Sequence, residues 1–171
     1  TQINLMVITV IASTLTAGSL TVFNLANNLQ TFPVSIFGIS FALAVFPLMA
    51  AAPTNEKIIE LFSRTFRHIL FFIIPAMVVI VSLRAQIVRL ILGSGKFDWN
   101  ATTLTMDTLA FFALSLFAQA ALPLLTRSFY AQHDSRTPLY TGLAAEAANV
   151  TLSIYFARKW GAPGLALGFS L

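Results

Sequence analysis

Charge is missing from the whole beginning of the chain. None of the first 55 residues is Asp, Glu, Lys, Arg or His, and the first ionisable side chain is Glu56. An ordinary soluble domain is about one quarter charged residues, whereas this chain of 171 residues is 9% charged and 57% hydrophobic. A core of that size cannot bury so much apolar surface, so the medium around these residues must be lipid.

Long apolar runs continue after Glu56, at residues 69–83, 108–126 and 137–157, and a last run starts at 163. A membrane-spanning helix needs about 20 largely apolar residues, and a helix satisfies its own backbone hydrogen bonds in lipid. The runs are continuous rather than alternating in polarity, which favours helices over strands. The sequence therefore predicts an all-α, polytopic membrane helix bundle with about five transmembrane helices and the start of a sixth.

Turn signals between the runs set the predicted helix bounds. Gly18 and Ser19 can end one helix and cap the next, with residues 27–33 as the alternative position for this turn. Pro33 should kink the long second helix because proline lacks an amide hydrogen. Residues 54–68 have the pattern of an amphipathic surface helix. We expect helices over 1–16, 20–50 with the kink at Pro33, 54–92 including the surface helix, 101–129, 137–158, and 163–171 after a turn at 161–164.

The ends and the loops bear on the class of protein. The chain opens without the charged region of a signal peptide and stops inside an apolar run, so we expect a fragment of a larger polytopic protein. It has no cysteine, which excludes disulfides and thiolate metal sites. Its ten Lys and Arg lie in short loops between spans, a membrane pattern rather than a nucleic-acid-binding one. They divide evenly between the two sides, so charge alone leaves the orientation open.

Three asparagines lie on one face of the second predicted helix. Asn24, Asn27 and Asn28 are spaced i, i+3, i+4, and Thr31 and Ser35 extend the row. Polar groups inside a membrane are costly and are therefore candidates for function. The alternative is hydrogen bonding between helices, where each amide contributes about 0.6–2 kcal/mol. The predicted substrate-cavity residues are Asn24, Asn27, Asn28 and Thr31.

A second intramembrane polar pair lies in the helix over 137–158. Glu146 and Asn149 are one turn apart, among glycine and alanine residues that let another helix approach closely. They are candidates for ion coupling; the alternative is a protonated Glu146 hydrogen-bonded to a neighbour such as Gln119. The sequence has no nucleophile–base pair and no metal-ligand spacing, so we expect a protein that is not an enzyme and needs no cofactor or metal.

The loop over 129–138 reads FYAQHDSRTP. It resembles the F-Y-[AS]-R-x-D-x-[RK]-T-P loop of the MurJ (MviN) family, bacterial lipid II flippases of the MOP exporter superfamily. The residues that match this pattern are Tyr130, Asp134, Arg136, Thr137 and Pro138.

Other segments resemble the family in order and spacing. They are Gly18-Ser19, Phe32-Pro33, Phe37-Gly38-Ile39, Pro47, the turn Gly93-Ser94-Gly95-Lys96-Phe97-Asp98, Asn149 and residues 161–167. The resemblance covers nearly the whole chain, and the F-Y…T-P loop is its most specific part.

The resemblance implies part of the second six-helix lobe of a fourteen-helix flippase in the bacterial cytoplasmic membrane. The F-Y…T-P loop would be cytoplasmic, and the helix over 20–50 would line the central cavity. The implied partners are the lipid bilayer, a lipid-linked diphosphate sugar and the remaining helices of the full-length protein. The implied mechanism is alternating access, without covalent chemistry.

One departure concerns the cavity helix. The family usually has a Y-A-D-R segment there, whose arginine faces the anionic headgroup. This chain has Leu25, Ala26, Asn27 and Asn28 at those positions. An amide offers neutral hydrogen bonds in place of the charge and bidentate fork of arginine. Either other helices of the full-length protein supply the cations, or this homologue carries a different cargo or is impaired. The alternative functions are a related multidrug or polysaccharide-precursor exporter, and a non-transporting membrane scaffold or degenerate homologue.

Overall fold

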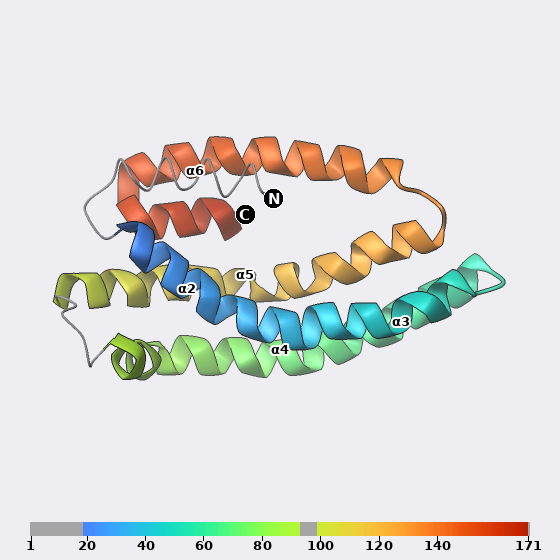
Figure 1. The fold of residues 1–171 in the computed structure, drawn as a ribbon, viewed down its shortest axis with the longest axis horizontal. Coiled ribbons are helices and arrows are strands. Elements are labelled where there is room, and N and C mark those ends of the chain that lie inside the picture. Colours follow the sequence, from blue (N-terminus) through green and yellow to red (C-terminus); the bar gives the residue numbers. More distant parts are fainter. Residues whose placement is uncertain (1–18, 93–98, 171) are drawn as a thin grey trace. The chain divides into compact units, whose positions relative to one another are not determined.

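The computed structural model describes residues 19–92 and 99–170, and within them every regular element is helical. The order along the chain is α2 (Ser19–Pro33), the π-helix η1 (Val34–Ile39), α3 (Ser40–Ala50), α4 (Asn55–Leu92), α5 (Trp99–Ala131) and α6 (Arg136–Ser170) (Figure 1). The predicted all-α class is confirmed for this part of the chain. The predicted helix over 1–16 and the glycine turn over 93–98 lie outside the described residues.

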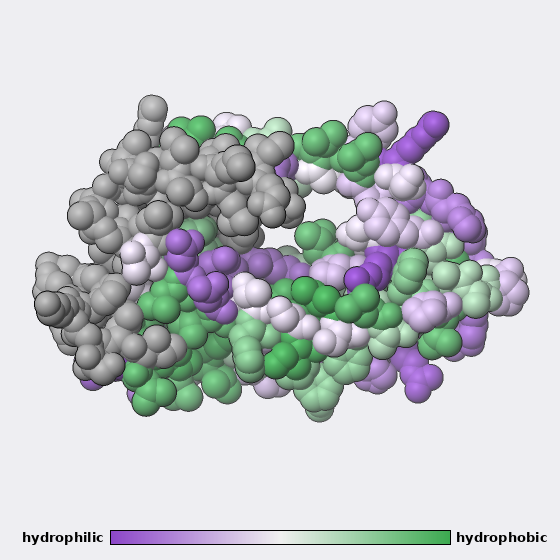
Figure 2. Space-filling model, viewed as in Figure 1, coloured by the Kyte–Doolittle hydropathy of each residue, from purple (hydrophilic) through white to green (hydrophobic). Residues whose placement is uncertain are grey.

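Among the described residues, three stretches are long and apolar enough to cross a membrane: Phe23–Ala50, Asn55–Leu90 and Thr105–Ala131. Large apolar side chains on them are open to the surroundings, with Phe71 71% exposed. Figure 2 shows apolar residues, in green, along much of the surface of α4. Such surfaces suit lipid rather than water. The span over 137–158 stays a prediction, because that part of α6 is less apolar.

The helix expected over 20–50 is divided in the structure. Pro33 ends α2, and the next six residues form η1 before α3 begins at Ser40. Proline cannot donate the backbone hydrogen bond that would continue an α-helix, and a π-helix is a wider turn in which the bonds run from i to i−5. At the end of η1 the Ser40 amide donates to the Ser35 carbonyl. A widened turn thus follows the predicted kink.

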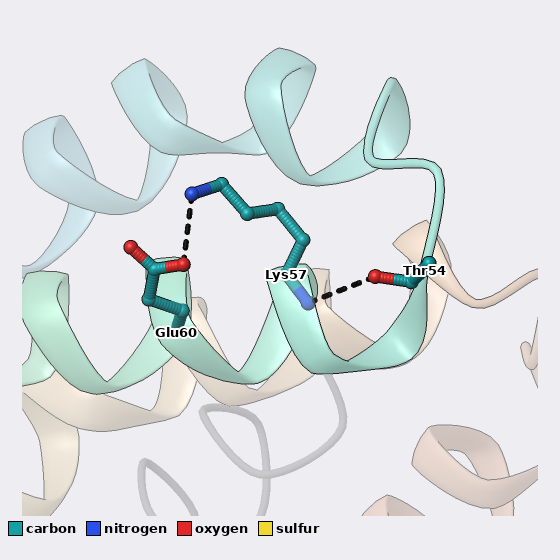
Figure 3. A network of polar contacts seen from close by, with 3 residues as sticks. All are labelled: Thr54, Lys57 and Glu60. Carbon is teal, nitrogen blue, oxygen red and sulfur yellow. Dashed lines mark hydrogen bonds and ion pairs between the residues drawn. The ribbon is translucent and has the colours of Figure 1, made fainter.

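α4 is one helix of 38 residues, so the predicted surface helix over 54–68 continues into the span without a break. The Thr54 Oγ1 accepts the Lys57 amide at 3.4 Å and caps the helix. The Lys57 ammonium pairs with the Glu60 carboxylate at 2.8 Å (Figure 3). At about 1.5 Å rise per residue, the helix is longer than the hydrocarbon is thick, at about 30 Å. Its charged beginning can therefore lie outside the hydrocarbon.

α6 also differs from expectation. The sequence predicted a turn at 161–164 between two helices, but the helix is continuous from Arg136 to Ser170. Figure 1 shows that its ribbon turns sharply back toward its C-terminal end. A bend within one helix thus takes the place of the predicted turn.

The chain divides into two compact units, and each unit contains parts of several helices. The first unit contains Thr1–Gln30, Val78–Ser115 and Ala144–Leu171. Its described core joins α2, α4 and α5, and the Phe23 and Phe112 rings meet edge to face with centroids 5.2 Å apart. The buried residues of this core are Phe23, Ala26, Val88, Leu109 and Phe112.

The second unit contains Thr31–Met77 and Leu116–Leu143. Gly38 of η1 packs directly on α5: a Cβ at this position would lie 2.7 Å from the Ala120 carbonyl oxygen and 2.8 Å from the Ala120 Cα. Small residues allow such close approach of helices in membranes. On the α4 side, the Phe37 and Phe72 rings stack with centroids 5.0 Å apart.

Candidate substrate-facing site

The exposed face of α2 carries several polar side chains, beside the exposed Phe32, although α2 belongs to a candidate span. Asn24 and Asn28, one helical turn apart, are both exposed, and so is Thr31. The opposite side of the helix carries Phe23 and Ala26, which are buried in the core of the first unit. Figure 2 shows hydrophilic side chains, in purple, gathered over α2. The spacing i, i+4, i+7 of Asn24, Asn28 and Thr31 makes one row along the helix.

Asn27 has a different orientation from the other two asparagines. It is half-buried, and its Oδ1 accepts a hydrogen bond from Gln30 Nε2 at 3.1 Å. Gln30 is only 1% exposed. The three amides predicted on one face therefore separate into an exposed pair and one that turns inward. The signal for this in the sequence was Gln30 itself, a polar residue one turn after Asn27.

The free energy of burying an amide limits what the row of Asn24, Asn28 and Thr31 can face. Moving an amide from water into hydrocarbon without a hydrogen bond costs about 4–8 kcal/mol. Two exposed amides against acyl chains would therefore be strongly destabilising, whereas hydrogen bonds to water, to a substrate or to another helix remove that cost. The row of Asn24, Asn28 and Thr31 is therefore suited to water or to polar groups, and unsuited to acyl chains.

Glu146 and Asn149 lie on the less exposed side of α6. Both are half-buried, whereas the four alanines around Glu146 are exposed. Ser153, one turn beyond Asn149, is fully buried, and its Oγ has no hydrogen-bond partner among the described residues. The structure thus places three polar side chains at i, i+3, i+7 on one side of α6. Gln119, considered above as a partner of Glu146, belongs to the second unit, and that alternative stays open.

The F-Y…T-P loop is a compact connector between α5 and α6. The Asp134 amide donates to the Phe129 carbonyl, and the His133 amide to the Tyr130 carbonyl, both at 3.0 Å. His133 has a φ of 58°. These bonds and this left-handed residue form a Schellman motif, which ends a helix by satisfying its last carbonyls. Glycine usually occupies the left-handed position, and histidine is one of the side chains that tolerate it.

Asp134 then caps the start of α6, which begins at Arg136. Its Oδ1 accepts the amides of Arg136 at 3.0 Å and Thr137 at 3.1 Å, and its Oδ2 accepts the Thr137 hydroxyl at 2.6 Å. The hydrogen bond from the Thr137 side chain, followed by the one from its amide, lowers the pKa of Asp134 below its usual value. Tyr130 and Arg136 are exposed and Pro138 is half-buried. The geometry shows directly that Asp134 and Thr137 shape the connector.

Two contacts of the second unit were not foreseen from the sequence. Besides the Gly38–Ala120 contact, Arg127 Nη1 donates to the Ile39 carbonyl at 3.4 Å. Neither has a local signal, because the partners are more than 80 positions apart in the chain. Within residues 19–92 and 99–170, no three His, Cys, Asp or Glu side chains come together as metal ligands would.

The family model described as lipid II flippase MurJ matches residues 1–171. The chain belongs to the MurJ family. A probable lipid II flippase MurJ of Rhizobium tropici is 32% identical over 98% of this chain. The probable lipid II flippase MurJ of Thermotoga maritima is 25% identical over 99% of it.

A solved structure of a lipid II flippase MurJ, in its inward closed conformation, superposes with a TM-score of 0.90 at 26% identity over 99% of this chain. The resemblance noted from the F-Y…T-P loop is thereby confirmed, as is a multi-pass helical membrane protein. The chain spans about a third of its MurJ relatives, 32% of the Rhizobium protein and 36% of the chain in the solved structure.

Proposed function

We propose that this chain is part of a flippase that moves lipid II across the bacterial cytoplasmic membrane by alternating access. The observation that carries the proposal is the exposed polar row of Asn24, Asn28 and Thr31 on a spanning helix of a MurJ-family chain. A transporter needs such a row where its substrate passes, because a hydrophilic headgroup requires hydrogen-bonding partners inside the membrane. No bond of the substrate need be made or broken.

In this proposal the row contacts the diphosphate sugar of the substrate. The amides of Asn24 and Asn28 can donate hydrogen bonds to phosphate oxygens and accept them from sugar hydroxyls. They carry no charge, so the attraction for the diphosphate is weaker here than arginine would provide. Cationic side chains for the diphosphate would come from the remaining helices of the full-length protein.

The test uses the full-length protein in liposomes with lipid II. The unmodified protein should move lipid II, and Asn28→Arg should bind it more tightly by roughly tenfold, because a hydrogen bond to a charged group is worth more than a neutral one. Asn55→Arg is the matched control, since Asn55 is exposed at the start of α4, away from the row. Equal affinities of the Asn28→Arg and Asn55→Arg variants for lipid II would show that Asn28 does not line the substrate cavity.

A second candidate function is cation-coupled export of another cargo, as in multidrug or polysaccharide-precursor exporters. The observation that favours it is the placement of Glu146 and Asn149 on the less exposed side of α6. A carboxylate and an amide can hold a proton or a metal cation and link its passage to transport. Glu146→Gln should then change the cation dependence of transport, and an unchanged dependence would leave Glu146 a structural residue. Transport of a dye but not of lipid II would favour this second function.

A further inference from the structure

The helices pass from one compact unit to the other at four points. These crossing points lie after Gln30 in α2, between Met77 and Val78 in α4, between Ser115 and Leu116 in α5, and between Leu143 and Ala144 in α6. Each unit is thus made of parts of the same helices, and relative movement of the units requires each helix to bend or twist at its crossing point.

A residue that weakens an α-helix stands near every crossing point. Pro33 follows the one in α2, and Pro75 precedes the one in α4. Pro123 lies about two turns beyond the one in α5, and Gly142 just before the one in α6. Proline removes a backbone hydrogen bond, and glycine lowers helix stability by about 1 kcal/mol relative to alanine. These are the usual sites of helix kinks.

The α2–α3 helix shows the strongest of these breaks. Pro33 is followed by the six π-helical residues of η1, whose wider turns are unusual within an α-helix and mark functional or strained places. The Ser40 hydroxyl also donates to the Ser35 carbonyl at 3.1 Å, which adds a side-chain bond across this widened turn.

Each side of this break is held by its own unit. Before it, α2 is fixed by Phe23 and Ala26 in the core of the first unit. After it, η1 is fixed within the second unit by the Gly38–Ala120 contact, the Phe37–Phe72 stack and the Arg127 hydrogen bond to Ile39. Residues 31–33 are the short stretch between these two anchored parts. The described contacts thus hold α2 before this stretch and η1 after it.

We propose that the four crossing points form a hinge inside this lobe. Bending there turns the Asn24–Asn28 row of the first unit while the second unit keeps its own packing. The effect of the hinge on transport rests on the proposed function, because turning the row changes the side of the membrane to which Asn24 and Asn28 are open. The hinge itself depends only on the crossing points, the prolines and the separate anchoring.

The experiment removes the two prolines next to crossing points in the full-length protein. Pro33→Ala with Pro75→Ala restores two amide donors and should stiffen the hinge. The matched control is Pro47→Ala, because Pro47 lies inside α3, well within the second unit. The segment has no cysteine. Once any cysteines in the rest of the full-length protein are replaced, spin labels can be attached at Gln86→Cys and Ser135→Cys, both exposed positions in different units. Pulsed electron paramagnetic resonance then measures the distribution of distances between the two spin labels in liposomes.

The double variant should narrow this distribution, and Pro47→Ala should leave it unchanged. Lipid II transport by the double variant should fall by roughly tenfold, the effect of about 1.4 kcal/mol on a barrier. If the double variant does not insert, each single variant should narrow the distribution by itself. A distribution for the proline variants that equals that of Pro47→Ala would overturn the hinge.

The outcome also separates the two proposals. A narrowed distribution in the double variant, together with no lipid II transport by the unmodified protein, would support the hinge and reject the proposed function. Normal lipid II transport by the unmodified protein with equal distributions in all variants would support the function and reject the hinge.

Discussion

The two compact units are built from parts of the same helices, yet they present different chemistry. The first unit exposes amides on α2, at Asn24 and Asn28, and carries Glu146 on α6. The second unit exposes leucines on α3, with Leu43 55% and Leu48 60% exposed. One continuous helical stretch thus changes from a polar to an apolar exposed face within the turns of η1.

The difference indicates that the two units face different surroundings. An exposed leucine is favourable in lipid and an exposed asparagine is costly there. The second unit is also held by a close backbone contact and by a hydrogen-bonded connector, whereas the first unit exposes the amides of Asn24 and Asn28. In the proposed function, Asn24 and Asn28 of the first unit meet the substrate, whereas the contacts of the second unit hold its helices together.

The largest expected effect tests the packing of the second unit. Gly38→Ala should lower the free energy of unfolding by about 3 kcal/mol, the upper end of the range for overpacking, because the new Cβ meets backbone atoms of Ala120 that cannot move aside. Gly142→Ala is the control: a Cβ there meets nothing within 4 Å, so this change should leave stability equal or raise it by up to about 1 kcal/mol through helix propensity. Unfolding in lipid nanodiscs measures both, and equal stability would contradict the close contact.

The next effect tests the contrast between the two exposed faces. Leu43→Asn should destabilise the protein in lipid by about 2 kcal/mol, because it exposes an unpaired amide to acyl chains and substitutions in proteins cost less than full transfer to hydrocarbon. Asn28→Leu, the reverse change on α2, should leave unfolding in nanodiscs little changed and reduce lipid II transport. If Asn28→Leu stabilises the protein without loss of transport, the α2 face is a lipid face like that of α3.

A smaller gain is expected at the connector of the second unit. His133 has a φ of 58°, where a side chain other than glycine is disfavoured by roughly 1–2 kcal/mol. His133→Gly should therefore raise stability by about 1 kcal/mol, part of which the flexibility of glycine in the unfolded chain offsets. Thermal unfolding measures the change, and a drop in the midpoint would mean that the imidazole itself makes a stabilising contact.

The smallest effect concerns pH. Hydrogen bonds from Thr137 and Arg136 lower the pKa of Asp134 in the folded protein, so the ionised carboxylate stabilises the fold. This stabilisation is present above the unfolded pKa of about 3.9 and is lost as the pH falls through the lower folded value. The midpoint of unfolding should be lower for Asp134→Asn than for the unmodified protein at neutral pH. The two should converge in acid, and a difference that persists there would point to another cause.

The composition of the chain by itself determined the solvent and the fold class. A stretch of 55 residues without an ionisable side chain can be stable only as helices in lipid, since burial in so small a core is impossible. The F-Y…T-P loop indicated the family from the sequence alone, because its Asp134 and Thr137 interact with each other within four residues of the chain. Information of this kind is local, so it can be read from the order of residues.

Only the tertiary structure decided which polar groups face outward. A helical pattern continued from 20 to 50 places Ser35 with the asparagine row, but the π-helix after Pro33 alters the phase of every later side chain, and Ser35 is half-buried. Asn27 turns inward to Gln30, and Gly38 is needed because Ala120, distant in sequence, occupies the space of a Cβ. These features depend on packing between helices, and packing partners are set by the whole fold rather than by adjacent residues.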